Sequence, residues 1–292
     1  MMSLASLNQL FQDHSSSLNA PIKQLTIDGK PFDRPALMAT VNLSRDSTYR
    51  ESIAINTEAA IRKSRVYFAQ GADLIDIGAE SSTAKASRVT PQDQITQLVP
   101  VIEQLTADSI PVSAETYEPE VVKACLSAGA KVLNFTGTAH EAEILDLASE
   151  FNATVILCYV GGANVREVTD LKLDEDPIPG LQDYFAKRIE TGLQHGVTNI
   201  VIDPGMGFYY GNLVDPLTRV KHQSNVILNS FRLRELGYPI CQALPHAFDL
   251  FGDEFRTAES FFAVIANLGG VNLLRTHEIS KVRAVMNAMN TV

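Results

Sequence analysis

The chain has 292 residues, 45% hydrophobic and 20% charged, an ordinary composition for a globular protein with one large core. Its net charge of −10 offers none of the basic balance typical of nucleic-acid binders, so we expect no nucleic-acid partner. No apolar run approaches the roughly 20 residues that span a bilayer, and the first residues do not read as a signal peptide, so we expect no membrane partner either.

Three cysteines, Cys125, Cys158 and Cys241, lie far apart in apolar surroundings. Their spacing indicates neither a metal site nor a disulfide framework. We interpret them as buried free thiols of a cytoplasmic protein.

Residues 1–33 form a polar amino-terminal extension. Within it, residues 26–30 read Thr-Ile-Asp-Gly-Lys, which predicts a hairpin turn. The extension could cover the floor of the domain that follows, pair with a partner subunit or be disordered.

From residue 34 to 292, apolar runs alternate with helical patterns. We predict strands at 36–42, 74–80, 110–116, 131–137, 154–160, 199–205, 238–244 and 270–277. We predict helices at about 54–70, 92–107, 118–129, 140–151, 177–195, 215–236, 256–268 and 280–290. Eight strand–helix pairs predict an α/β fold, a single (β/α)8 TIM barrel with a short amino-terminal extension. An open doubly wound sheet is the alternative, although no G-x-G-x-x-G follows the first strand.

Polar residues stand at the ends of the predicted strands, where a barrel builds its active site. In chain order they are Asn42; Asp76, Glu80, Ser81 and Ser82; Glu115 and Thr116; Asn134; Tyr159; Asp203 and Phe208; Gln242 and His246; and Arg275 and His277. A lone Asn here, or an Asp before Pro-Gly, is usually a turn former. Together, however, these residues would converge on one mouth.

The types of residue in this set suggest a ligand. Two carboxylates and one amide, from Glu115, Asn134 and Asp203, suit a flat heterocycle with mixed donors and acceptors, such as a pterin or guanine. Arg275 and His277 alternate on one strand and so point to the same side, a plausible phosphate anchor. The amide oxygen of Asn42 could meet a phosphate or a Mg²⁺ ion.

The motifs resemble those of dihydropteroate synthases and the wider family of pterin-binding barrels. The matching segments are 41–47, similar to N-V-T-P-D-S-F; 71–82, similar to G-A-x-I-I-D-I-G-G-E-S-T; 112–117, similar to I-S-V-D-T-x; 132–134, similar to I-I-N-D; 202–208, similar to L-D-P-G-x-G-F; and 274–278, similar to R-V-H-D. The resemblance spans about residues 35–290.

The resemblance implies a reaction, condensation of 6-hydroxymethyl-7,8-dihydropterin pyrophosphate with p-aminobenzoate, and a homodimer formed through the last helices. It implies a pterin pocket, to which we assign Asp76, Glu115, Asn134, Asp203 and Phe208. It also implies a catalytic set, to which we assign Asn42 with Mg²⁺ and pyrophosphate, Arg275 and His277 with pyrophosphate, and His246.

Several positions depart from the family pattern. Glu115 stands where the family has Asp, and His246 is the nearest candidate to replace the basic residues of a Ser-Arg-Lys motif. The loops expected to meet the second substrate also differ: Arg45 lies in the first, and Ser82, Thr83 and Lys85 lie in the second, where an Arg is lost. Lys does not replace the bidentate hydrogen bonding of Arg.

Three other functions stay open beside an active synthase. One is a pterin-binding relative whose reaction is lost or changed. Another is a corrinoid-linked folate methyltransferase, which uses a similar pterin floor. The last is a barrel with a structural or regulatory role and no small ligand.

Overall fold

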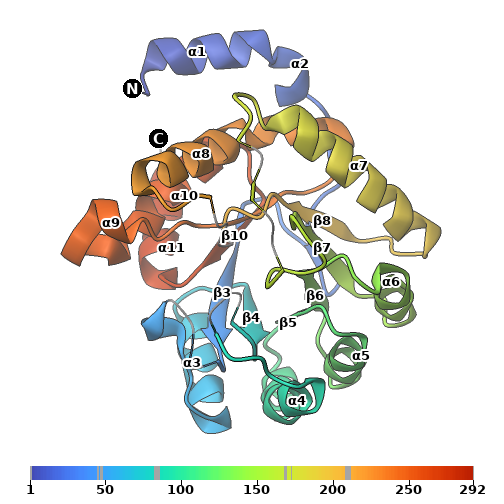
Figure 1. Cartoon of the computed structure of the whole chain (residues 1–292). Helices are drawn as coiled ribbons and strands as arrows, with labels where there is room; N and C mark the ends of the chain where they lie inside the picture. The colour runs from blue at the N-terminus through green and yellow to red at the C-terminus, as the bar shows by residue number, and fades with distance from the viewer. Residues whose placement is uncertain are drawn as a thin grey trace.

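Eight parallel strands form the centre of the molecule (Figure 1). The structure is a computed structural model that describes residues 2–44, 46, 49–81, 86–167, 170–171, 173–207 and 212–291. The strands are β3 (Ala36–Asn42), β4 (Leu74–Gly78), β5 (Val112–Thr116), β6 (Val132–Phe135), β7 (Thr154–Cys158), β8 (Ile200–Asp203), β9 (Cys241–Ala243) and β10 (Leu273–Thr276). Their order is β8-β7-β6-β5-β4-β3-β10-β9.

The two ends of this sheet meet. A parallel bridge joins Ile202 of β8 to Ile240 beside β9, and the amide of Ile202 donates to the carbonyl of Pro239 at 3.0 Å. The sheet is therefore nearly closed into a (β/α)8 barrel, as the alternation of strands and helices predicted, and the open doubly wound alternative is wrong.

Helices surround the barrel (Figure 1). They are α3 (Thr57–Ala69), α4 (Pro91–Ala107), α5 (Pro119–Ser127), α6 (Glu141–Glu150), α7 (Ile178–Gln194), α8 (Pro216–Leu228), α9 (Phe248–Phe251), α10 (Ala258–Leu268) and α11 (Ile279–Met289). Three 3-10 helices cover Arg50–Ser52, Asn229–Leu236 and Gly252–Thr257. The predicted helix at 215–236 is thus α8 followed by a 3-10 segment. Asp215 begins α8 by accepting a hydrogen bond from the amide of Thr218 at 2.7 Å, a side-chain cap before a proline.

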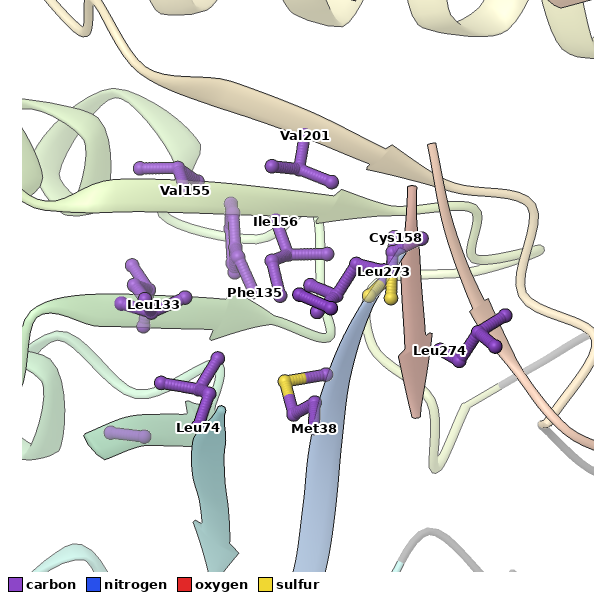
Figure 2. Close-up of a cluster of buried hydrophobic side chains, with 14 of the residues drawn as sticks. Met38, Leu74, Leu133, Phe135, Val155, Ile156, Cys158, Val201, Leu273 and Leu274 are labelled. Atoms are coloured by element: carbon purple, nitrogen blue, oxygen red, sulfur yellow. The ribbon is translucent and has the colours of Figure 1, made fainter. Parts of the chain in front are cut away.

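The strands are apolar because both of their faces are covered. Figure 2 shows side chains from six strands meeting in one buried cluster, among them Met38 of β3, Phe135 of β6 and Leu273 of β10. These side chains are at most 1% exposed. Packing of this kind makes the barrel interior a rigid core, so that polar groups at the strand ends are held in fixed positions.

The extension covers the barrel floor, one of the three possibilities that its sequence allowed. Its two short strands, β1 (Thr26–Ile27) and β2 (Lys30–Pro31), pair antiparallel and form the predicted hairpin. Leu25 and Ile27 are buried in the main core, and the hydroxyl of Thr154, at the start of β7, donates to the carbonyl of Thr26 at 3.2 Å.

Two helices precede the hairpin. They are α1 (Leu4–Asp13), which buries no residue, and α2 (Ser15–Leu18). Phe11 of α1 makes an edge contact with Phe231, with ring centroids 5.6 Å apart.

Two further expectations concern the chain as a whole. All three cysteines are free and buried, as predicted. No helix in the described part of the chain is long and apolar enough to cross a membrane.

The buried hairpin gives a stability test. Leu25→Ala should lower the free energy of unfolding by about 2–5 kcal/mol, because it leaves a cavity under the barrel. Leu4→Ala, at a leucine of the same extension that is 87% exposed, is the matched control and should change it by less than about 0.5 kcal/mol. Urea unfolding measures both. Equal effects would contradict a floor-covering hairpin.

Candidate active site

The strand ends bring an arginine, three carboxylates and an amide together at the carboxyl-terminal mouth of the barrel. Arg275, on β10, places Nε 2.7 Å from Oδ2 of Asp76, on β4, and Nη2 donates to Oε2 of Glu115, on β5. Oδ2 of Asp76 also accepts a hydrogen bond from Nδ2 of Asn134, on β6, at 3.1 Å. Asp203, at the end of β8, lies near enough to this group to influence the pKa of Glu115. We call these five residues the floor network, because they form the floor of the candidate pocket. This pocket lies at the mouth, opposite the end of the barrel that the extension covers.

The floor network is buried, and it contains more acidic than basic side chains. Burial raises the pKa of Glu115 to about 7, although Arg275 opposes that shift. Burial also raises the pKa of Asp203 to about 6, against hydrogen bonds from the Gly205 amide and the Cys241 thiol. Since burial disfavours the charged form, protons are taken up by this pocket close to neutral pH.

The extra methylene of Glu115 has a structural consequence. It extends the carboxylate of Glu115 on β5, which reaches the guanidinium of Arg275 on β10 although β4 and β3 lie between these strands in the sheet. The replacement of the family's usual Asp by Glu115 is therefore accompanied by a direct ion pair with Arg275 inside the pocket.

Arg275 is engaged by carboxylates in this structure. We predicted it as a pyrophosphate anchor beside His277; the guanidinium instead pairs with Asp76 and Glu115, and its side chain is only 14% exposed. The anchoring role of Arg275 stays a prediction.

Asp203 begins the loop after β8 with a tight turn. Its Oδ1 accepts from the amide of Gly205 at 2.8 Å, and Gly205 has a φ of 78°. Gly207 follows with no room for a side chain, since a Cβ there would lie 2.6 Å from the Cβ of Ala243. The turn-forming and ligand-binding interpretations of Asp203 are thus compatible, because the turn fixes where the carboxylate points.

Two cysteines take part in the pocket, which the sequence did not indicate. Cys158, at the end of β7, places Sγ 3.2 Å from Oδ1 of Asn134, and Cys241 hydrogen bonds to Asp203. Burial raises the pKa of both thiols well above its usual range, so both stay protonated and act as weak donors. The position of Cys158 at the end of its strand was an available signal, whereas Cys241 begins β9.

His246 and His277 gather around a residue that the sequence analysis missed, Glu259, in the first turn of α10. Nδ1 of His277 lies 2.8 Å from Oε1 of Glu259, and Nδ1 of His246 lies 3.2 Å from the same oxygen. Tyr49, also missed, stacks on His277 with ring centroids 4.4 Å apart. Glu259 is only 1% exposed. The sequence did not reveal this burial, because the pattern of the helix also reads as amphipathic.

Asn42 closes β3 and is held by the loop that follows. Its Nδ2 donates to the hydroxyl of Ser52 at 2.7 Å, and that hydroxyl donates to the carbonyl of Tyr49 at 2.7 Å. The amide is therefore fixed at the mouth by a short 3-10 turn.

The remaining predicted residues fall outside the described part of the chain. They are Arg45, Ser82, Thr83, Lys85 and Phe208.

Next to the second loop, Arg166 donates to the carbonyls of Ser81 and Ala86, both at 2.5 Å. Arg88 donates to the hydroxyl of Tyr117 at 2.8 Å. Neither arginine was singled out from the sequence.

Comparisons with known proteins place the chain in a family. The model of the family described as "Pterin binding enzyme" matches residues 38–277, so the chain belongs to that family. Dihydropteroate synthase from Bacillus subtilis (strain 168) is 23% identical over 271 residues, 89% of each chain. The enzyme of that name from Synechocystis is 28% identical over 226 residues, 75% of this chain and 74% of the relative. The solved structure of Xanthomonas albilineans dihydropteroate synthase with 4-aminobenzoic acid is 26% identical, with a TM-score of 0.77 over 92% of this chain and 97% of that one.

We expect loss of the Arg275 cation to lower the stability of the folded protein by an amount that depends on pH. Arg275→Gln leaves Asp76 and Glu115 buried without a partner and should destabilise the protein by about 3–5 kcal/mol at pH 7.5. Loss of the cation raises the carboxyl pKa values in the folded state. Stability is then lost as pH rises through those values, and the difference from the unsubstituted protein shrinks as pH falls.

Urea unfolding at pH 5.5 and 7.5 tests this expectation. Arg34→Gln is the matched control, since Arg34 also makes two side-chain hydrogen bonds to carboxylate oxygens, both of Asp73, but its side chain is 40% exposed. It should cost at most about 1 kcal/mol at both pH values. A pH-independent loss in the Arg275 variant would contradict the proposed charge balance.

Proposed function

We propose that the chain is a dihydropteroate synthase-like transferase of folate biosynthesis, which condenses 6-hydroxymethyl-7,8-dihydropterin pyrophosphate with p-aminobenzoate. The observation that carries this proposal is the floor network, in which Asp76, Glu115, Asn134, Asp203 and Arg275 meet at the mouth of one barrel. The match of residues 38–277 to the pterin-binding family supports it.

Binding of the pterin follows from the donors and acceptors of that network. An ionised Asp203 accepts two N–H bonds from the aminopyrimidine edge, and Asn134 offers an amide that both donates and accepts. The hydrogen bonds that Asn134 makes to Asp76 and Cys158 fix its orientation before the ligand arrives. A preorganised pocket of this kind binds without first reorganising its dipoles.

The reaction breaks one bond and forms another at the methylene carbon of the pterin. The C–O bond to pyrophosphate breaks with both electrons leaving on oxygen, and the resulting cation is shared with the pterin ring. The amine of p-aminobenzoate then forms the new C–N bond and loses a proton. His246 and His277 lie at the strand ends beside the floor network, where their imidazoles can hydrogen bond to the departing pyrophosphate.

Mg²⁺ fits as an ion that arrives with the substrate. Asn42 offers one amide oxygen at the mouth, and Mg²⁺ is usually held by one or two protein oxygens together with substrate phosphates. Bound there, the ion would neutralise charge on the leaving group. Asn42 itself, oriented by Ser52, would position the phosphates.

A homodimer and a cytoplasmic location belong to the same proposal. Phe261 of α10 is 46% exposed and Leu268 is 37% exposed, which supports a contact through this helix. Val282 and Met286 of α11, by contrast, face the core, being 0% and 2% exposed.

A pterin-binding protein without synthase activity is the second candidate, and one observation favours it. The segment that follows β9 carries Leu244, Pro245 and His246 where the family has Ser-Arg-Lys. Loss of two cations near the second substrate could remove several kcal/mol of transition-state stabilisation. A corrinoid-linked folate methyltransferase finds no specific support.

Product formation tests the proposed reaction. Purified protein with both substrates and Mg²⁺ should yield dihydropteroate, and Asp203→Ala should lower the rate at least about 100-fold, because it removes the acceptor of the pterin edge. Asp146→Ala, at an exposed aspartate that pairs with His195, is the control and should match the unsubstituted protein. No product from a folded protein that still binds a pterin would favour the second candidate.

The pKa of Asp203 gives a binding test. The carboxylate of Asp203 has a pKa of about 6, so below that pH it must lose a proton for the ligand to bind. Affinity for 6-hydroxymethylpterin, which has no phosphate to titrate, should therefore fall by about tenfold per pH unit below pH 6. The Asp203→Asn variant should bind the pterin more weakly, and its affinity should not show this pH dependence. The same step in the Asn variant, seen by isothermal titration calorimetry, would assign the dependence to another group.

A further inference from the structure

Three side chains outside the floor network converge on one buried point. His246 lies in the loop after β9, His277 follows β10 directly, and Glu259 lies in the first turn of α10. Each offers one ligand atom, and these atoms all lie within 4.8 Å of one another. We call these residues the His-Glu-His cluster.

We propose that the His-Glu-His cluster binds one divalent first-row transition metal ion of the zinc class. Two imidazoles and one carboxylate are a donor set that holds zinc and leaves a fourth position open. Imidazole nitrogen favours zinc, copper or nickel, whereas magnesium prefers oxygen ligands. This site is therefore chemically different from the oxygen site proposed at Asn42.

The distances suit such an ion after small movements. Oε1 of Glu259 lies 2.8 Å from Nδ1 of His277 and 3.2 Å from Nδ1 of His246. Ligands of a tetrahedral ion with bonds of about 2.0–2.1 Å stand about 3.3 Å apart. Oε1 of Glu259 is thus within about 0.5 Å of that spacing from each imidazole nitrogen, and all three ligand atoms lie within 4.8 Å of one another.

The far oxygen of Glu259 is held in place by its own partners. Oε2 accepts hydrogen bonds from the hydroxyl of Thr276 and from the backbone amides of His277, at 2.8 Å, and Glu278, at 3.2 Å. These bonds turn Oε1 toward the two imidazoles. Outer-shell hydrogen bonds that orient a ligand in this way are typical of metal sites.

The charge of Glu259 also calls for a cation. Among the described residues, its only basic neighbours within ion-pair distance are His246 and His277. The adjacent Glu278, by contrast, pairs with both Arg256 and Lys281. A buried charge without a cationic partner is costly.

A neutral imidazole binds metals through a ring nitrogen. Nδ1 of His246 is buried and, in the described part of the chain, has no hydrogen-bond partner, although it faces Glu259. An ion would satisfy this nitrogen.

Aromatic rings shield the cluster. Tyr49 lies against both imidazoles, with ring centroids 4.4 Å from His277 and 4.7 Å from His246, and Phe248 lies 5.2 Å from His246. An ion here would supply positive charge next to a strand end that lacks the family's basic residues. That consequence rests on the proposed function, whereas metal binding itself does not.

Metal titration of the full, untagged chain tests the site. Metal-stripped protein should bind one equivalent of Co²⁺ with the visible absorption of a low-coordinate ion, and Zn²⁺ should displace it while millimolar Mg²⁺ should not. His246→Ala and His277→Ala should each weaken Co²⁺ binding at least about 10-fold. His195→Ala, at a histidine that likewise pairs with a carboxylate, that of Asp146, but outside the cluster, should bind as the unsubstituted protein does.

Circular dichroism of the metal-free variants confirms that each is folded before titration. The proposal is overturned if the folded, unsubstituted protein binds no Co²⁺ at micromolar concentrations, or if both cluster variants bind like the His195 control. In that case Glu259 only orients two histidines by hydrogen bonds. Binding of Co²⁺ by a protein that forms no dihydropteroate would support the metal site and count against the proposed reaction alone.

Discussion

The ion pairs of Arg275 with Asp76 and Glu115 are the interaction on which the site depends. Three carboxylates from β4, β5 and β8 meet in a buried mouth, and such a group repels itself unless a cation lies within it. Arg275 supplies that cation from β10 and links strands that lie at different places in the sheet. The residual imbalance leaves Glu115 and Asp203 with pKa values near neutrality, so the pocket exchanges protons in the range where a ligand would bind.

The barrel makes this arrangement possible because its core is rigid and apolar. The strand interiors are mostly apolar, with Thr40, Ser113 and Gln242 as buried polar exceptions, and most polar side chains of the site lie at or near the strand ends. The closing bridge between β8 and β9 brings Asp203 into the same mouth as residues more than 100 positions earlier in the chain. At the opposite end of the barrel, the hairpin of the extension packs against the start of β7 and the main core.

The mouth contains two chemically distinct halves. One, built on β4, β5, β6, β8 and β10, carries carboxylates, an amide and a guanidinium suited to a flat heterocycle. The other half lies between β9, β10 and α10. There, His246 and His277 both contact the buried carboxylate of Glu259, and Tyr49 stacks on His277. The family's basic residues are missing after β9, and in their place stands a histidine whose partner carboxylate comes from a different element. The charge after β9 thus differs from the family pattern, while the residues that we propose to bind a heterocycle are present.

The sequence by itself determined the fold and named every residue of the floor network as a strand-end residue, although it assigned Arg275 to the pyrophosphate and not to the pterin pocket. Buried parallel strands read as continuous apolar runs, and polar residues that end such runs must converge in a barrel, so Asp76, Glu115, Asn134, Asp203 and Arg275 could all be named in advance. Only the tertiary structure decided their pairing, because which carboxylate meets Arg275 depends on strand order and on the reach of one methylene. It alone showed Glu259, Tyr49 and the two pocket cysteines. Their roles arise from burial and from neighbours distant in the chain, and neither leaves a periodic signal in the sequence.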